Sequence, residues 1–71
     1  MRTLVVSEQG AEISVQGDAL VLSVGGREAR RVAFAELGLV VVMGQVELTS
    51  GARRELLRRG IDAVFLSAGG R

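Results

Sequence analysis

The chain has 71 residues, a net charge of +1 and an apolar fraction of 48%. A chain of this length forms one small domain, 1–71, with a marginal core. Because it contains no Cys and no His, disulfides, thiolate metal sites and the most common general base are excluded. The small net charge does not indicate strong attraction of the whole chain to nucleic acid.

The apolar residues occur in short runs, and none approaches the roughly 18 residues that a transmembrane span needs. Near the N-terminus, Glu8 interrupts the apolar residues before the core of a signal peptide can develop. Since the chain has neither a targeting segment nor a Cys, we expect a cytoplasmic protein without membrane contact.

The first third of the chain predicts a β-meander. Residues 3–7 are rich in β-branched side chains, and residues 12–16 alternate polar and apolar side chains, which is the pattern of a half-buried strand. The pair Gly17-Asp18 suits a type II′ hairpin turn, and residues 19–24 form the returning strand. A second two-residue turn follows at the Gly-Gly pair 25–26.

Residues 27–37 fit two interpretations. The spacing of their apolar residues fits a helical stripe, whereas Val32 and Phe34 alternate as in a strand. The Gly-Gly turn directly before the segment favours a hairpin partner, so we expect a strand at about 28–34. Residues 35–38 then form a short turn that can include one helical turn.

Residues 39–43 are apolar without interruption, which is typical of a strand that is covered on both faces. Gly44 interrupts this run and indicates a bulge or a close backbone approach. The extended segment then continues to Leu48. Met43 is expected in the core, as is Phe65 in the later apolar run.

The segment 50–59 predicts the one helix of the chain. Thr49 or Ser50 can cap its N-terminus through a side-chain oxygen, and Gly60 stands where a left-handed C-terminal residue is needed. Residues 61–66 form the next strand, also buried, so that strand, helix and strand make one right-handed crossover unit. The side of the helix that we expect to face the core carries Ala52, Leu56 and Leu57.

No set of residues predicts a catalytic, cofactor-binding or metal-binding site. The acids lack the spacing of a known cation site, and the serines have neither a His nor a Lys to activate them. The stretch Val-Gly-Gly-Arg at 24–27 lacks the Gly-x-x-x-x-Gly-Lys pattern of a phosphate loop and is interpreted as a hairpin turn. We therefore do not expect the chain alone to be an enzyme.

All nine basic residues are Arg, and four of them fall within positions 53–59. Arg54, Arg58 and Arg59 are expected to share the solvent side of the helix, away from Leu56. Because an Arg fork can bind phosphate in a bidentate manner, these three residues are candidate contacts for DNA phosphate or an acidic partner. The alternative is a solvated helix face in a protein from a GC-rich genome.

An ordered set of apolar and glycine positions extends over the whole chain. It includes Leu4-Val5-Val6, Ala19-Leu20-Val21-Leu22, Val32-Ala33-Phe34 and, as its most specific part, VVVMGQVELTSGARRELLRRGIDAVFLS at 40–67. In order and spacing this set resembles the N-terminal β-domain of the CRISPR adaptation integrase, the universal CRISPR-associated endonuclease that inserts spacers. The resemblance implies a small β-domain that a linker joins to a larger helical domain. The ending Ser-Ala-Gly-Gly-Arg, at 67–71, fits such a linker.

The resemblance also implies where the chemistry of the family lies. The metal-binding Glu, His and Asp would belong to the helical domain, where they would hold Mg or Mn for cleavage and transesterification of DNA. The β-domains would help to form a homodimer and a platform for protospacer DNA. A second, ferredoxin-like adaptation protein would be a further partner.

We therefore expect a mainly β, small α+β domain of about six short strands, with one helix near 50–59. Its expected function is dimerisation and DNA positioning within a spacer-acquisition endonuclease of CRISPR antiviral defence, without catalysis by this chain itself. The alternative from another class is a free-standing, non-enzymatic β interaction module.

Overall fold

The computed structural model describes residues 1–66, which form seven strands, one α-helix and one short 3₁₀ helix. The segment 67–71, which we expected to be a linker, lies outside the described residues. The strands are β1 (Arg2–Val6), β2 (Ala11–Gln16), β3 (Ala19–Val24), β4 (Arg27–Ala33), β5 (Leu37–Met43), β6 (Val46–Leu48) and β7 (Asp62–Leu66), and the helices are η1 (Phe34–Glu36) and α1 (Ser50–Arg58).

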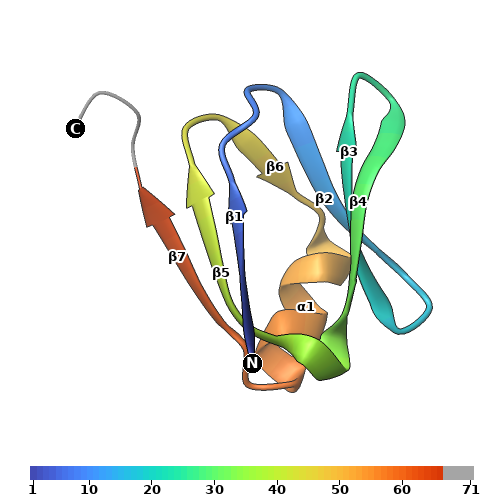
Figure 1. Ribbon diagram of the computed structural model, residues 1–71, viewed down its shortest axis with the longest axis vertical. Coiled ribbons are helices and arrows are strands. Elements are labelled where there is room, and N and C mark those ends of the chain that lie inside the picture. The colour runs from blue at the N-terminus through green and yellow to red at the C-terminus, as the bar shows by residue number, and fades with distance from the viewer. Residues whose placement is uncertain (67–71) are drawn as a thin grey trace.

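The strands form two sheets with α1 at one end (Figure 1). The three-stranded sheet has the order β1-β5-β7, and both of its strand pairs are parallel. The four-stranded sheet has the order β4-β3-β2-β6. The helix contacts β2 of one sheet and β7 of the other. The predicted mainly β, small α+β fold is therefore confirmed.

The predicted meander exists, but it consists of β2, β3 and β4. Gly17 has a φ of +61°, which suits the first central position of a type II′ turn. Gly25 and Gly26 both have positive φ, +62° and +79°, as a type I′ turn requires. The strand predicted at 28–34 is confirmed by β4, and the helical interpretation of this segment is wrong.

Contrary to the prediction for the first third of the chain, β1 does not belong to the meander. It pairs in parallel with β5, so that Leu4 lies beside Val40 and Val6 beside Val42. All four side chains are buried between the sheets. A local turn pattern cannot encode this pairing, because the burial that stabilises it comes from a distant part of the chain.

Gly44 separates β5 from β6. Its φ is +79°, which favours glycine, and the amide end of the Gln9 side chain lies against it. The group that approaches Gly44 is thus a flexible side chain and not another backbone segment. After Gly44 the chain leaves the three-stranded sheet, and β6 pairs with β2. The extended segment that we predicted to be continuous is therefore two strands, and the total becomes seven instead of about six.

The crossover through α1 joins two neighbouring strands of the three-stranded sheet. β7 pairs in parallel with β5. The predicted strand–helix–strand unit is therefore confirmed for β5 and β7, but β6 lies in the other sheet. The turn predicted near 35–38 contains one helical turn, η1, and the following strand already begins at Leu37.

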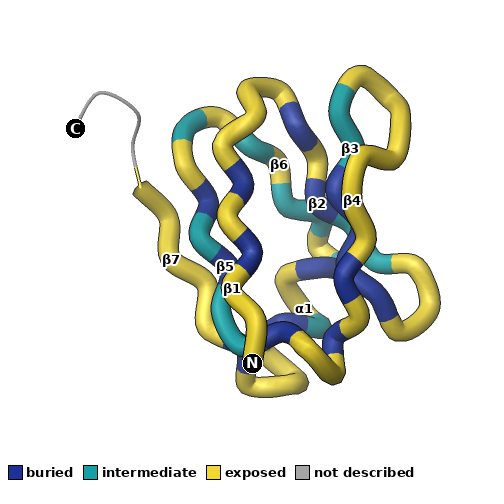
Figure 2. The backbone as a smooth tube through the Cα atoms, viewed as in Figure 1, coloured by how far each residue is buried: buried dark blue, intermediate teal, exposed yellow. Residues whose placement is uncertain are grey.

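The hydrophobic core lies between the two sheets and against α1. Along several strands, buried residues alternate with more exposed ones (Figure 2). Among residues 1–66, no helix is long and apolar enough to cross a membrane. The largest fully buried side chains are Ile13, Leu20, Leu22, Leu37, Val6 and Val40.

Candidate interaction surface

The outer face of the three-stranded sheet is apolar and open to solvent. On β5, Val40 and Val42 point into the core, while Val41 is only partly buried and Met43 is 39% exposed. The prediction that both faces of this strand are covered, with Met43 in the core, is therefore wrong. Among residues 1–66, the four-stranded sheet and α1 both lie on the first face (Figure 1), and side chains on the second face such as Val5 and Val64 are exposed.

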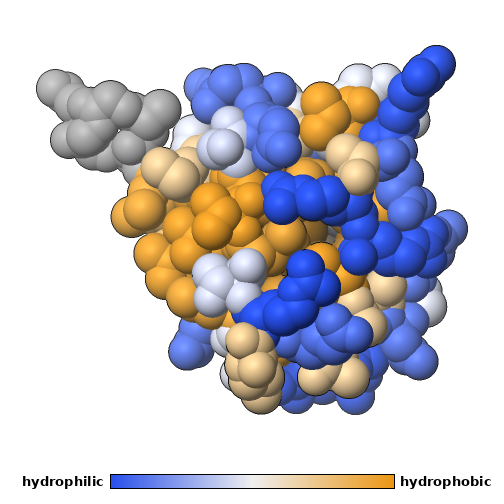
Figure 3. Space-filling model, viewed as in Figure 1, coloured by the Kyte–Doolittle hydropathy of each residue, from blue (hydrophilic) through white to orange (hydrophobic). Residues whose placement is uncertain are grey.

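The open face continues from β5 onto its two neighbours. The register sets Val5 of β1 and Val64 of β7 beside Val41, and Leu66 beside Met43. We call these five residues the outer face. Figure 3 shows apolar residues gathered over β1, β5 and β7, with hydrophilic surface beside them.

The edge strand β7 is exposed along its whole length. Phe65 is 55% exposed, so its predicted place in the core is wrong, as is the prediction that the strand is buried. The apolar run Ala63–Leu66 suggested burial, but β7 has a neighbouring strand on one side only, where it pairs with β5. The position of a strand at the edge of its sheet depends on the whole topology and cannot be read from the run itself.

An apolar groove of about 380 Å³ lies between α1 and β7. Leu57, which we predicted on the buried side of the helix, is 78% exposed at this groove. The contact of α1 with the sheets is narrow, and only Ala52 and Leu56 are fully covered. The groove is lined by Leu48, Arg53, Leu56, Leu57, Ile61, Asp62, Ala63 and Phe65.

Both ends of α1 are held by specific hydrogen bonds. Of the two candidate caps, Thr49 is the N-cap, and its Oγ1 accepts a hydrogen bond from the Ala52 amide at 3.1 Å. At the C-terminus Gly60 has a φ of +69°, as predicted. The amides of Gly60 and Ile61 donate to the carbonyls of Leu57 and Leu56 at 3.2 and 2.9 Å, which is a Schellman motif.

The three candidate contact arginines of α1 lie in different surroundings. Arg58 is 2.8 Å from a carboxylate oxygen of Glu55, and Arg59 pairs with the same carboxylate at 2.9 Å. Arg54 is exposed and has no ion pair among residues 1–66. Hydrogen bonds from Arg58, and then from Arg59, lower the pKa of Glu55 to about 2. The helix therefore presents less free positive charge than its arginine content suggests.

Arg59 is the most constrained of the three. Its guanidinium lies over the ring of Phe34, 4.5 Å from the centroid, and it is 3.7 Å from a carboxylate oxygen of Asp18. Its side chain is 30% exposed, whereas that of Arg58 is 63% exposed. We had expected these residues to share one solvent side of the helix, but Arg59 is held against η1 while Arg58 is open to solvent.

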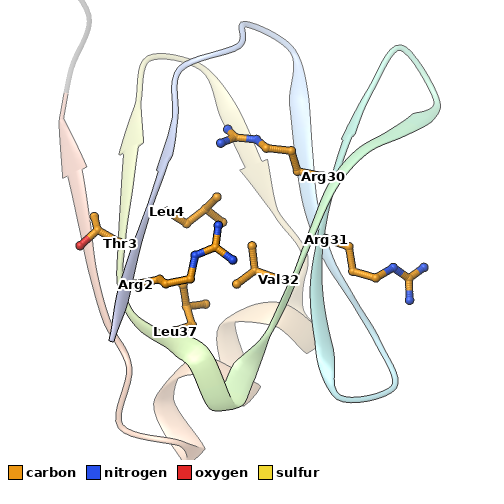
Figure 4. Close-up of a pocket in the computed structure, with 7 residues that line it drawn as sticks. All are labelled: Arg2, Thr3, Leu4, Arg30, Arg31, Val32 and Leu37. Atoms are coloured by element: carbon orange, nitrogen blue, oxygen red, sulfur yellow. The ribbon is translucent and has the colours of Figure 1, made fainter.

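Arg30 is a structurally important residue that the sequence analysis did not identify. It reaches from β4 across a cleft of about 180 Å³ towards β1, whereas Arg31 points away from the cleft (Figure 4). Its Nη2 donates to the Val5 carbonyl at 2.8 Å and lies 3.7 Å from a Glu8 carboxylate oxygen. Only the knowledge that β1 and β4 face each other could have drawn attention to Arg30.

The described residues do not fit a catalytic metal. Among residues 1–66, no group of three or more His, Cys, Asp or Glu side chains is close enough to hold a metal ion. No step of metal chemistry can therefore be derived for this part of the chain. The described residues instead present features that suit binding to another molecule: an apolar sheet face, an exposed strand edge, a groove and several arginines.

Known sequences that are similar to this chain point to one protein family. The family described as CRISPR associated protein Cas1 matches residues 4–71. A CRISPR-associated exonuclease Cas4/endonuclease Cas1 fusion from Rhodospirillum rubrum is 42% identical over 60 residues. That similarity covers 84% of this chain but only 10% of the relative, so the chain spans about a tenth of the relative's length.

Two solved structures share the fold. A partial Cas6-RT-Cas1–Cas2 complex contains a chain that superimposes with a TM-score of 0.92 and is 20% identical, covering 99% of this chain and 21% of that one. A casposase bound to integration product gives a TM-score of 0.70 at 19% identity, covering 96% of this chain and 23% of the casposase chain. At these identities the similarity concerns the fold alone.

Proposed function

Because the chain belongs to the CRISPR associated protein Cas1 family, we propose that it is the N-terminal domain of a longer spacer-acquisition integrase. In this proposal the domain brings two copies of the protein together and positions DNA. Cleavage and joining of DNA would be carried out by another part of the longer protein, which would also hold the Mg or Mn ion. This chain would not be catalytic by itself.

The observation that carries the assembly role is the open outer face. A small domain that leaves Val5, Met43, Val64 and Leu66 each at least 39% exposed on one sheet presents a contiguous apolar surface. Monomeric proteins rarely leave such patches uncovered, and larger ones mark sites of protein association. A two-fold homodimer is the commonest way in which a chain covers a surface of this kind.

Two names among the structural neighbours support the further partners. One neighbour is a Cas6-RT-Cas1–Cas2 complex, and the other is a casposase bound to integration product. By analogy, we propose a second adaptation protein and protospacer DNA as partners of the longer protein. The arginines of α1 are the candidate phosphate contacts, because guanidinium groups suit phosphate oxygens.

A second candidate function is a free-standing β interaction module. It is favoured by the independent core of the domain, in which no buried polar side-chain atom of residues 1–66 lacks a hydrogen-bond partner. The two functions differ in what the reading frame beyond residue 71 encodes. A helical domain with spaced Glu, His and Asp would support the integrase, whereas a stop codon would support the module.

The assembly role is tested by sedimentation equilibrium of the purified chain over a wide concentration range. We expect a monomer–dimer equilibrium. A monomer at every concentration would contradict this role. Incubation of the same chain with DNA and manganese tests the other half of the proposal, and we expect no cleavage. Metal-dependent cleavage by the pure chain would place catalysis in this domain and overturn that half.

A further inference from the structure

The inner face of the three-stranded sheet is covered along β1 and β5 but open along β7. Val40 and Val42 of β5 are buried in the core between the sheets. The register sets Ala63 beside Val40 and Phe65 beside Val42, so these two β7 residues share the inner face, yet both are exposed. Among residues 1–66, the elements that cover this face therefore stop short of β7.

The exposed inner side of β7 is one wall of the groove beside α1. Ala63 and Phe65 line the groove from the strand, Leu57 lines it from the helix, and Leu48 lines it from the end of β6. The side chain of Leu57 is largely exposed although it is apolar. Because apolar side chains gain free energy when they leave water, these walls favour binding of another apolar surface.

The shape of the groove suits a helix better than a strand. The groove is walled by side chains, so an extended segment lying in it would bury backbone N–H and C=O groups without partners. A helix satisfies these groups internally and can fill a groove with apolar side chains at i, i+3 or i+4, and i+7. The nine residues of α1 span about 13.5 Å, which is the length of about two and a half turns of a second helix.

The groove also carries one charge of each sign. Arg53 is in the first half of α1, and Asp62 begins β7, just after the turn that ends the helix. Neither residue has an ion pair among residues 1–66. A helix carries partial negative charge at its C-terminus and partial positive charge at its N-terminus, so its C-terminus is favoured near Arg53 and its N-terminus near Asp62. A helix in this groove should therefore run antiparallel to α1.

We propose that the groove receives an amphipathic helix from another part of the longer protein, packed antiparallel to α1 against the inner face of β7. The inference rests on the proposed function, in which this chain is one domain of such a protein. The similarity covers only 10% of the fusion relative and 21% and 23% of the two structural neighbours, so each of these proteins has much further chain outside the matched part. The docked helix covers Leu57 and Phe65 and fixes how this domain sits on the rest of the protein.

The size of the groove favours a segment of the same polypeptide over a separate partner. Its walls come from only three short elements, whereas stable complexes between separate proteins bury about 1,200–2,000 Å². A segment that is joined to this domain by the backbone is held near the groove at an effective concentration on the order of millimolar. A small contact is then enough to keep it bound.

The occupant of the groove can be identified by photo-crosslinking in the longer protein. Benzoylphenylalanine in place of Leu57 sits on the groove wall, and irradiation should join it to a helical segment outside residues 1–71 of the same polypeptide, in a product of monomer mass. Fragment mapping should find the joined positions spaced three or four residues apart, as on one face of a helix. The control is benzoylphenylalanine in place of Val5, which is exposed on the outer face and should give no internal product.

Loss of docking should also change the sensitivity to protease. Leu57→Asp sets a charge against the apolar face of the helix, so it should raise the rate of limited proteolysis between the two parts of the longer protein by about tenfold or more. Arg54→Asp, on the same helix but outside the groove, is the matched control and should leave the rate unchanged. In the 71-residue chain, Leu57→Asp should leave the midpoint of urea unfolding unchanged, because Leu57 is mostly exposed there.

Charge reversals test the orientation of the docked helix. Arg53→Glu and Asp62→Arg each set a charge against the helix end of the same sign, so each should raise the rate of proteolysis. A slower rate in both variants would show that the helix runs in the opposite direction, and the antiparallel packing would be wrong.

Three other results would overturn the inference. A product of dimer mass from position 57 would place a second copy in the groove, and a Leu57→Asp protein that is cut as slowly as the wild-type protein would show that nothing docks there. If the reading frame stops after residue 71, the proposed function and this inference fail together. If it continues but position 57 gives no internal product, this inference alone fails.

Discussion

The guanidinium of Arg59 lies 4.5 Å from the centre of the Phe34 ring. This contact ties the C-terminal end of α1 to η1, the turn between β4 and β5. The same guanidinium pairs with Glu55 on its own helix and approaches Asp18 in the β2–β3 turn. One side chain therefore connects the helix to the four-stranded sheet and to η1, the turn through which the chain passes from that sheet to the three-stranded sheet.

Replacement of Arg59 by Ala should lower the free energy of unfolding by about 1–2 kcal/mol, since it removes a partly covered cation–π contact and two ion pairs. Arg59→Lys keeps the charge but loses the planar group, so it should recover only part of that stability. Arg54→Ala is the control and should change the stability by less than about 0.5 kcal/mol. Urea unfolding followed by circular dichroism measures all three. Equal effects of the Arg54 and Arg59 substitutions would show that the Phe34 contact contributes nothing.

The helix N-terminus offers a test in which two neighbouring hydroxyl residues are compared. Thr49 Oγ1 accepts a hydrogen bond from the Ala52 amide, so Thr49→Ala should destabilise the domain by about 1 kcal/mol. Ser50 is the first residue inside α1, and Ser50→Ala should change the stability little. Thermal or urea unfolding of the two variants compares their stabilities. If Ser50→Ala lowered the stability more than Thr49→Ala, the N-cap would be Ser50 instead of Thr49.

Two glycines at opposite ends of α1 should respond to alanine with opposite signs. Gly60 has a φ of +69°, where a Cβ is unfavourable, so Gly60→Ala should lower the stability by about 1–2 kcal/mol. Gly51 lies inside the helix, and a Cβ there meets nothing within 4 Å. Gly51→Ala should raise the stability by about 0.5 kcal/mol, because alanine loses less conformational entropy. Denaturant midpoints that move in the same direction for both variants would contradict this account.

The response to acid should depend on Glu55. Its pKa in the folded protein is about 2, below the ordinary value of 4.5, because Arg58 and Arg59 donate hydrogen bonds to the carboxylate. A lowered pKa in the folded state adds stability above the ordinary value, and this stability is lost as the pH falls towards 2. Glu55→Gln should therefore flatten the decline in unfolding midpoint between about pH 5 and about pH 2.

The control for this titration is Glu47→Gln, an exposed carboxylate on β6 for which residues 1–66 provide no ion pair. It removes one carboxylate without removing an ion pair seen in residues 1–66, so it separates the loss of a charge from the loss of the Glu55 contacts. The contribution of Glu55 should also shrink in part at high salt, since Arg58 is open to solvent and ions screen such a pair. A pH profile that is identical in the Glu55→Gln and wild-type chains would mean that these hydrogen bonds do not persist in solution.

The features predicted from the sequence are those that neighbouring residues determine. The turns at Gly17 and Gly25-Gly26, the cap at 49–50 and the left-handed Gly60 each depend on a few adjacent positions, and all are present. A glycine pair before β4 was enough to choose strand over helix for that segment. These turns and caps can be predicted from the sequence because few residue types can adopt the conformation that each position needs.

The predictions that failed concern which part of the chain lies beside which. The pairing of β1 with β5 joins segments that are distant in sequence. Phe65 and Leu57 have the composition of core residues but lie at an edge strand and on an uncovered helix side. An apolar side chain favours burial, but its residue type does not show whether another part of this domain or a partner molecule covers it. For that reason the candidate interaction surface emerged only from the arrangement of the two sheets.

The arginines of α1 give the last prediction, which concerns DNA binding by the longer protein. Arg54 is exposed, the side chain of Arg58 is 63% exposed, and that of Arg59 is only 30% exposed and lies over Phe34. The Arg54→Ala, Arg58→Ala double variant therefore tests phosphate contact without removing the stacking of Arg59. Each phosphate contact adds about 0.9 to the slope of log affinity against log salt, so the slope should fall by up to about 1.8.

Binding should weaken alike for all DNA sequences, because phosphate contacts position the duplex and do not read bases. Arg27→Ala, on β4, is the control and should leave the salt slope unchanged. Arg58 is already paired with Glu55, so a DNA phosphate must compete with that carboxylate. If the salt slope falls by only about 0.9, Arg54 alone contacts the DNA backbone. An unchanged slope in a folded double variant would show that this side of the helix faces water or a protein partner.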